Sequence, residues 1–364
     1  MKITVVDLFC GIGGLTHGLQ LAGLNVVAGY DIDPTCQFAY EKNNNATFVQ
    51  ADVATIPITE LNNHYIDSDI KILVGCAPCQ PFSKYTMRYR KNSAVNSDVF
   101  DSSDKNHSKW DLVKSFSEKI QLLLPDIVSM ENVPELVNTR VFEEFLAILE
   151  NCEYHVSYGI AFCPDYGVPQ NRKRLVLLAS RFCEIGLIPP EYTPDKYKTV
   201  KLTIGELPKI ESGEKHADDV LHFCASLSKV NLKRIRASKP GGTWREWDKS
   251  LQLKCHKKNS GKTYGAVYGR MSWDLPSPTI TTQFYGYGNG RFGHPEQDRA
   301  LSWREGALLQ SFPPDYELVD PTKEINRRLI GTHIGNAVPV ELGRAIGISI
   351  LNHIAEVMGN EEQQ

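Results

Sequence analysis

The chain has 364 residues and a formal net charge of −3, and 41% of its residues are hydrophobic. This length and composition fit one large α/β domain plus a smaller one, and they exclude a chain that is disordered throughout. No run approaches the roughly 18 to 20 continuous apolar residues that span a membrane, and the start lacks the basic and apolar regions of a secretion signal, so we expect a cytoplasmic protein without a membrane partner.

The first half of the chain alternates short apolar runs with helical patterns, which is typical of a parallel sheet covered by helices. Leu15, Leu19 and Ala22 mark one face of a helix, and Gly23 follows at the position of a left-handed cap. Strands are predicted over residues 3–9, 25–30, 47–50, 71–75 and 127–130, and a further helix over residues 111–124.

The pattern changes after residue 181. Residues 154–162 and 174–180 are predicted to pair as a hairpin, and the proline-rich run 188–194 cannot continue a helix or a central strand. From there to about residue 316 the chain is rich in Gly, Pro, Lys and aromatic residues, which predicts a second, irregular domain. A last helix is predicted over residues 339–358, and its apolar stripe should pack on the first domain.

The charges are unevenly distributed along the chain. Between Lys229 and Arg270, twelve Lys and Arg stand against two acids, a net +10, whereas the remainder carries −13. Such a segment is either a solvated loop or a phosphate-binding surface. Four aromatic residues interleaved with the charges favour the second interpretation: Trp244, Trp247, Tyr264 and Tyr268.

Nine cysteines are scattered along the chain, and the only close pair is Cys76 and Cys79. A structural zinc site needs about four ligands, and no second CxxC or spaced histidine pair accompanies this one, so we expect no metal. A CxxC redox or zinc-binding module remains an alternative of a different class.

A glycine-rich turn, DLFCGIGG at residues 7–14, follows the first predicted strand. Such a turn can hold a nucleotide at the carboxyl edge of a sheet, and it can also be a plain tight turn. Thr16 stands where the dinucleotide fingerprint requires a third glycine, which argues against a nicotinamide dehydrogenase. Asp31 and Asp52 follow the second and third strands, where each can bind a ribose or an adenine, or cap a helix. Together these features predict an adenosine without phosphates.

Three further motifs follow strand ends. In GCAPCQPFS, residues 75–83, small and kinked residues hold Cys79 out of the sheet, where a thiolate would be a strong nucleophile. Glu131, in ENVP, can be held protonated and donate to a ring nitrogen. In QNRKR, residues 170–174, an arginine can contact a base carbonyl or be ordinary surface charge. Asn336, in GNAVP before the last helix, is either a buried ligand anchor or a cap.

Taken in order, these motifs resemble those of the DNA (cytosine-5) methyltransferase family. The set consists of FCGIGG, APCQPFS, ENV, QNRKR and GNAVP, with PTITT and QSFP between them. The resemblance spans nearly the whole chain, with one small departure at Ala77, where the family often has a second proline. It implies an α/β fold, a Rossmann-like class I methyltransferase domain with a smaller, irregular target-recognition domain.

The resemblance also implies domain roles and site residues. Residues 1–184 would form the catalytic and S-adenosylmethionine-binding domain, 185–325 the target-recognition domain, and 326–364 a C-terminal segment that returns to the first. The implied catalytic residues are Cys79, Glu131, Arg172 and Arg174. The implied cofactor contacts are Phe9, Gly11, Gly13, Gly14, Leu15, Asp31, Ile32, Asp52, Val53, Pro78 and Asn336. With the basic segment included, the expected DNA contacts are Gln80, Ser83, Arg245, Lys257, Lys258, Lys262, Arg270 and Thr282.

The implied reaction is methylation of carbon 5 of a flipped-out cytosine in duplex DNA, through a covalent bond between Cys79 and carbon 6. The implied partners are DNA, bound by a monomer, and a companion restriction endonuclease encoded separately. A transfer-RNA cytosine methyltransferase is the nearest alternative, and the large basic segment favours DNA over it.

Overall fold

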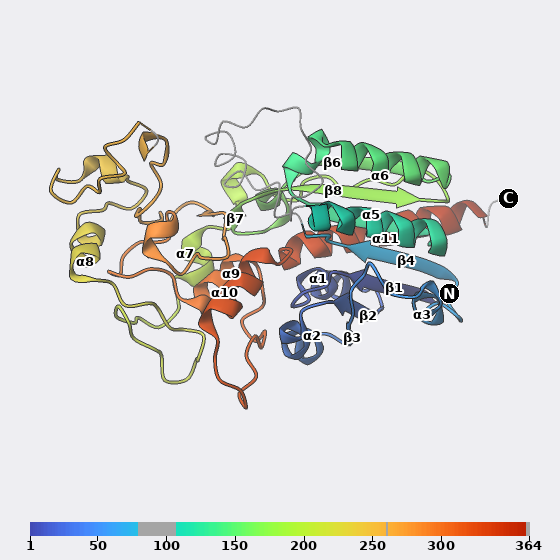
Figure 1. Cartoon of the computed structure of the whole chain (residues 1–364), viewed down its shortest axis with the longest axis horizontal. Helices are drawn as coiled ribbons and strands as arrows, with labels where there is room; N and C mark the ends of the chain where they lie inside the picture. The colour runs from blue at the N-terminus through green and yellow to red at the C-terminus, as the bar shows by residue number, and fades with distance from the viewer. Residues whose placement is uncertain (79–106, 260, 362–364) are drawn as a thin grey trace. The chain divides into compact units, whose positions relative to one another are not determined.

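The computed structural model describes the backbone of residues 1–78, 107–259 and 261–361. The chain divides into two compact units (Figure 1). Unit 1 consists of Met1–Phe162, Lys173–Pro189 and Val340–Gln364, and unit 2 consists of Cys163–Arg172 and Pro190–Pro339. The divisions therefore lie near Pro189 and Pro339, and the short insertion 163–172 also belongs to unit 2.

Unit 1 is built on a seven-stranded sheet with the order β3-β2-β1-β4-β5-β8-β6. Its strands are β1 Ile3–Leu8, β2 Val26–Asp31, β3 Thr47–Gln50, β4 Ile70–Gly75, β5 Ile127–Asn132, β6 His155–Phe162 and β8 Lys173–Ser180. The first five strands in this order are parallel, and β8 runs antiparallel to both β5 and β6. The predicted hairpin is confirmed, as is the Rossmann-like order of the parallel strands.

Helices pack against this sheet, and Figure 1 shows α5 and α6 running alongside one another. The helices of unit 1 are α1 Gly14–Ala22, α2 Gln37–Asn43, α3 Ile58–Asn63, α5 His107–Leu123, α6 Arg140–Asn151 and α11 Val340–Glu361. Phe116 of α5 and Phe142 and Phe145 of α6 are buried against the strands in one apolar cluster. The predicted apolar face of α1 is likewise buried, and Gly23 ends the helix with φ 104°.

The last helix packs inside unit 1, as its apolar stripe predicts. A Cβ on Gly18 of α1 would lie 2.3 Å from the backbone oxygen of Val340, so only glycine allows the two helices to approach this closely. His353 of α11 lies 2.8 Å from the hydroxyl of Ser180 at the end of β8. One helical stretch among the described residues, Arg327–Gly359, is long and apolar enough to cross a membrane, but 67% of its most apolar window is buried within the protein, as in a core helix.

Unit 2 has little regular structure. Its two-stranded sheet pairs β7 Gln170–Asn171 with β9 Ser277–Pro278. Its helices are α7 Val200–Ile204, α8 Lys229–Arg236, α9 Trp303–Leu309 and α10 Arg327–Asn336. The sequence predicted only irregular runs here, because helices this short depend on caps and tertiary contacts rather than on a long apolar period.

Candidate active site and nucleic-acid surface

The carboxylate of Glu131 is held between residues of two neighbouring strands. Glu131 lies near the end of β5 and is only 6% exposed. The thiol of Cys76, directly after β4, donates a hydrogen bond to Oε2 over 3.3 Å. Arg174 of β8 places its Nε 2.8 Å from Oε1, in an ion pair that lacks the geometry of a hydrogen bond. Oε1 therefore has no hydrogen-bond partner among the described residues, although it is buried.

Asn132 fixes the backbone of the motif that contains Cys79. Its side-chain amide donates to the carbonyl of Ala77 over 3.1 Å, and its Oδ1 accepts from the amide of Val133. Neither Asn132 nor Cys76 was predicted as a site residue, although Asn132 belongs to the ENV motif and Cys76 to the CxxC pair. Cys79, Gln80 and Ser83 lie outside the described residues, and Pro78, the last residue before them, is exposed.

The glycine-rich turn has the backbone conformation of a ligand cradle. Phe9, Gly11 and Gly13 all have positive φ angles of 61°, 51° and 85°, and Gly13 caps the N-terminus of α1. The amide of Gly11 donates to Oδ2 of Asp31 over 2.9 Å, so the turn is tied to the end of β2. A Cβ on Gly11 would meet nothing within 4 Å, which leaves open space beside the turn.

The other predicted cofactor residues of unit 1 differ in their exposure. Ile32 is 65% exposed and Asp52 is half-buried, with Oδ1 accepting from the amide of Ala54. Gly14, Leu15 and Val53 are buried. Asn336, at the end of α10 in unit 2, is exposed, so of the two predicted alternatives, a buried ligand anchor or a cap, the buried anchor is wrong.

A buried acid lies under the turn. Asp7 of β1 is 1% exposed, and burial raises its pKa to about 7, despite a hydrogen bond of 2.6 Å from Thr16. Thr16 also lies 3.1 Å from the hydroxyl of Tyr40. Thr16, the residue that departs from the dinucleotide fingerprint, therefore links β1, α1 and α2 in the core of unit 1.

Arg172, one of the predicted catalytic residues, is buried within unit 2. It is 2% exposed, and its guanidinium donates to the carbonyls of Ile280 and Gly335 over 3.0 and 3.2 Å. Gln170 is also buried, and it bonds to Gln310 and to the amide of Ile280 over 2.7 and 2.8 Å. The QNRKR motif thus separates into residues that hold unit 2 together and Arg174, which contacts Glu131 in unit 1.

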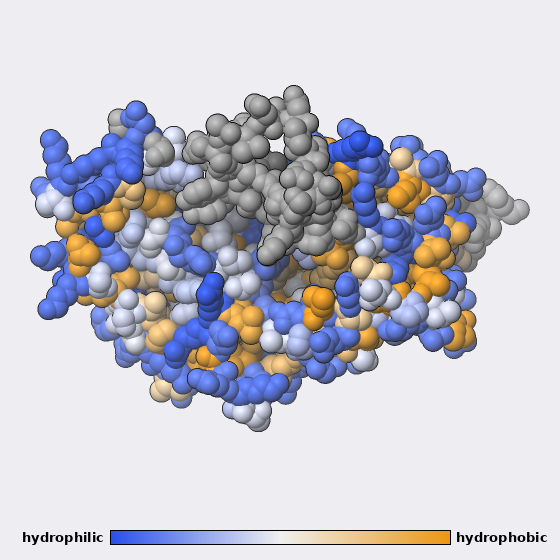
Figure 2. All heavy atoms as spheres, viewed as in Figure 1, coloured by the Kyte–Doolittle hydropathy of each residue, from blue (hydrophilic) through white to orange (hydrophobic). Residues whose placement is uncertain are grey.

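The basic segment of unit 2 presents many of its charges to solvent. Figure 2 shows hydrophilic residues gathered around α8 and the loop that follows it. Arg245 is exposed beside the ring of Trp244, with its guanidinium carbon 5.4 Å from the ring centroid. The segment's exposed cations, which we call the basic face, are Lys229, Lys233, Arg236, Lys239, Arg245, Lys249, Lys254, Lys257 and Lys258. Thr282 is half-buried, and the side chain of Lys262 lies outside the described residues.

The aromatic residues of this segment form a small core instead of an exposed stacking surface. Trp244 and Trp247 are each 5% exposed, and His256 stacks on Trp244 with ring centroids 4.2 Å apart. Arg270 is 5% exposed and donates to four backbone carbonyls and to Asp298, so its assignment as a DNA contact is wrong in this structure. The aromatic residues therefore support the loop that carries the basic face.

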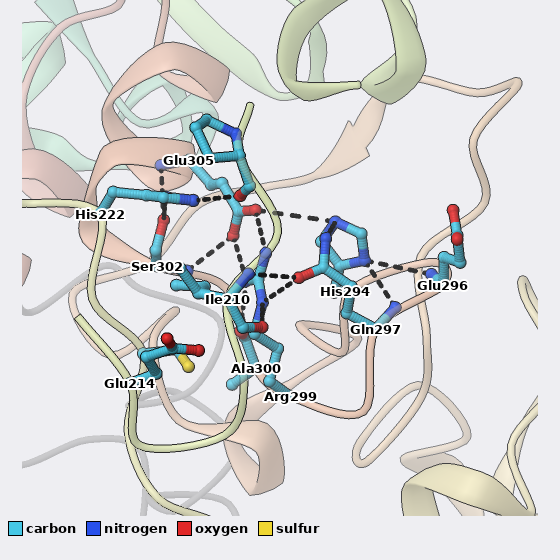
Figure 3. Close-up of polar contacts among 12 residues, drawn as sticks. Ile210, Glu214, His222, His294, Glu296, Gln297, Arg299, Ala300, Ser302 and Glu305 are labelled. Atoms are coloured by element: carbon cyan, nitrogen blue, oxygen red, sulfur yellow. Dashed lines mark hydrogen bonds and ion pairs between the residues drawn. The ribbon is translucent and has the colours of Figure 1, made fainter. Parts of the chain in front are cut away.

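A buried ionic network stabilises unit 2, and Figure 3 shows Arg299 and Glu305 pointing toward each other at its centre. Arg299 is 1% exposed and Glu305 0%, and two guanidinium nitrogens donate to the two carboxylate oxygens over 2.8 and 2.7 Å. Glu305 also closes a capping box with Ser302 at the start of α9. His294 lies 3.7 Å from the carboxylate, and burial lowers its pKa to about 4.

Comparison with known proteins identifies a consistent set of relatives. The model of the family described as C-5 cytosine-specific DNA methylase matches residues 3–352. The Type II methylase M.HgiDII of Herpetosiphon aurantiacus is 50% identical over 349 residues, which cover 95% of this chain and 94% of the relative. The Type II methyltransferase M1.HphI of Haemophilus parahaemolyticus is 30% identical over 96% of this chain and 87% of its own length.

Solved structures share the fold at low identity. A candidate DNA modification methyltransferase of an E. coli prophage superposes with a TM-score of 0.71 at 19% identity, covering 96% of this chain and 99% of that one. The S. pombe Dnmt2 methyltransferase superposes with a TM-score of 0.58 at 18% identity, covering 98% and 99%.

Proposed function

The chain belongs to the C-5 cytosine-specific DNA methylase family, and we propose that it transfers a methyl group from S-adenosylmethionine to carbon 5 of cytosine in a specific duplex DNA sequence. The observation that carries this proposal is the buried carboxylate of Glu131, which has Arg174 beside Oε1 and no hydrogen-bond partner on that atom among the described residues. A buried polar atom without a partner is costly, so it indicates a ligand that completes its hydrogen bonding.

The cradle at the end of β1 fits an adenosine-containing methyl donor. The open space beside Gly11 and the acid at the end of β2 match the requirements of such a ligand. When bound, S-adenosylmethionine would supply an electrophilic methyl group. The turn and Asp31 would hold it, with Ile32 and Asp52 as further side-chain contacts.

Cytosine itself must be activated, because its carbon 5 is a weak nucleophile. The thiolate of Cys79 would form a bond to carbon 6 while Glu131 gives a proton to ring nitrogen 3, so that the electron pair of the 5,6 double bond becomes available at carbon 5. After methylation, loss of the carbon 5 proton to a base and departure of Cys79 would restore the double bond, and the proton on ring nitrogen 3 would return to Glu131.

Arg174 explains how the buried acid can release its proton. Once Glu131 has protonated the ring, a carboxylate would remain in a site that is almost closed to water. The guanidinium 2.8 Å away stabilises that charge and would also lie near the base carbonyl. The reacting base must leave the helical stack, at a cost of a few kcal/mol, and the basic face would contact the phosphates of the DNA.

The names of the relatives suggest the biological setting. Type II methylases accompany restriction enzymes, so we propose that the chain protects DNA as a monomer in a restriction–modification system with a separately encoded endonuclease. Bisulfite sequencing of DNA from cells that express the protein would identify the methylated sequence. Methylation of transfer RNA but not of duplex DNA would instead support the RNA-modifying alternative.

The reaction is tested with duplex DNA and a tritiated methyl donor. We expect Cys79→Ser to lose turnover, whereas Cys152→Ser, at a half-buried cysteine after α6, should keep it. DNA containing 5-fluorocytosine should trap a covalent complex with the wild-type protein and not with Cys79→Ser, since fluorine cannot leave as a proton does. Glu131→Gln should lose turnover and still bind the donor. Full activity of Cys79→Ser would remove the thiol from the reaction.

A further inference from the structure

Cys76 lies against the carboxylate to which the proposed function assigns proton transfer. We infer that Cys76 is a positioning residue, whose thiol occupies Oε2 of Glu131 and thereby reserves Oε1 for the cytosine. The inference rests on the proposed function, because it assigns separate roles to the two oxygens of the proposed acid.

The position of Cys76 follows from the strand register. Gly75 at the end of β4 pairs with Met130 of β5, so the next residue of each strand lies at the same edge of the sheet. The amide of Cys76 donates to the carbonyl of Leu8 over 3.3 Å, and the following carbonyl, of Ala77, accepts from Asn132. The backbone of Cys76 is therefore held from both sides, and its sulfur stays 3.3 Å from Oε2.

The thiol acts as a hydrogen-bond donor and not as a thiolate. Burial and the neighbouring charge of Glu131 raise the pKa of Cys76 well above its usual value, so the S–H proton is retained. A thiol is a weak donor, and here it donates to Oε2 of Glu131.

The same contact fixes the orientation of the carboxyl group. The terminal torsion of a glutamate side chain has a broad energy minimum, so it needs external contacts to select one orientation. Cys76 holds one oxygen and Arg174 lies beside the other, which aligns the carboxyl plane between β4 and β8. Without the thiol, Oε2 would lose its donor and the two oxygens could exchange places.

Two substitutions separate hydrogen bonding from packing. Cys76→Ala removes the donor, whereas Cys76→Ser keeps a donor of similar size. Single-turnover methylation of duplex DNA at saturating donor is followed across a pH series. For Cys76→Ala we expect a single-turnover rate about 5- to 10-fold lower, from loss of orientation, with an unchanged dissociation constant for the donor in a separate binding titration.

The pH profile provides a measurement that packing alone would not change. Loss of a donor to the carboxylate makes the acid harder to ionise, so the alkaline limb should move to higher pH by about 0.5 to 1 unit in Cys76→Ala. Cys76→Ser should restore the limb and most of the rate. Cys152→Ala serves as the matched loss of a thiol.

The outcomes are distinct. An unchanged rate and profile in Cys76→Ala, or equal losses in Cys76→Ala and Cys76→Ser with lower melting temperatures and no shift of the limb, would overturn the positioning role. If one of these Cys76 outcomes is found while Glu131→Gln is inactive in the same assay, the positioning role fails and the proposed role of Glu131 stands. If Glu131→Gln is fully active, the proposed role of Glu131 fails first.

Discussion

Replacing Arg299 with methionine removes the cation from the buried ion pair of unit 2. The carboxylate of Glu305 would keep the amide of Ser302 at 2.7 Å and His294 at 3.7 Å, but it would lose both guanidinium hydrogen bonds. Breaking a buried pair from one side leaves an uncompensated charge, which costs about 3 to 5 kcal/mol. The carbonyl of Ile210, which accepts from the same guanidinium over 3.2 Å, would also lose its donor.

Urea unfolding followed by tryptophan fluorescence measures this loss. Four of the five tryptophans lie within the sequence of unit 2, so the signal reports mainly on that unit. A matched control is Lys209→Met, because Lys209 is 77% exposed and pairs with Glu296 at 3.1 Å on the surface of unit 2. Exposed pairs of this kind contribute under about 0.5 kcal/mol, so the control should unfold like the wild type.

The pH dependence provides a second measurement. In the wild type, Arg299 lowers the pKa of Glu305 against the opposing effect of burial, so this pair adds stability above the unfolded pKa and loses it in acid. In Arg299→Met, burial would dominate and raise the pKa of Glu305. The difference in unfolding free energy between variant and wild type should therefore be largest near neutral pH and become small in acid. A loss below about 1 kcal/mol at neutral pH, or one that does not depend on pH, would refute this account.

Three further predictions concern other parts of the chain. Because burial raises the pKa of Asp7 to about 7, the free energy of unfolding of the wild type should fall as the pH rises from the pKa of this carboxyl in the unfolded chain to about 7. Asp7→Asn should remove this slope and raise the free energy of unfolding, measured with urea at alkaline pH, by up to about 4 kcal/mol. Replacing Lys257 and Lys258 with alanine should make the slope of log binding constant against log salt concentration shallower, by up to about two units. An unchanged slope would mean that these cations do not contact phosphates and are only solvated. Gly18→Ala should destabilise unit 1 by more than about 1 kcal/mol, because the added Cβ would meet the backbone of Val340. Circular dichroism on heating measures this loss, and a wild-type melting curve would contradict the tight approach of α1 and α11.

The sequence determined the sheet and the places where chemistry can occur. Apolar runs of strand length, each followed by glycine, proline or an acid, predicted five parallel strands and placed the DLFCGIGG, APCQPFS and ENV motifs at their carboxyl ends. The structure confirms the strands and the parallel order, and it extends β5 to Asn132, so that Glu131 lies within the strand. These features could be predicted because they depend on neighbours along the chain.

Burial was harder to infer from residue type. Arg270, Trp244 and Trp247 looked like a nucleic-acid surface because they lie among lysines, but each is at most 5% exposed. Charged and aromatic side chains serve equally well as core and as interface, and the difference depends on which carbonyls and rings surround them. Arg172 shows the same limit, since the alternation in QNRKR could not separate it from Arg174.

Contacts between residues far apart in sequence were decided only by the tertiary structure. Cys76 and Glu131 are 55 residues apart, and no local pattern predicts that a thiol should donate to that carboxylate. Their pairing follows from the order of β4 and β5 in the sheet, which brings the two strand ends together. Local chemistry thus identified the residue types of the candidate site, whereas the long-range strand register determined which oxygen of Glu131 remains available to a ligand.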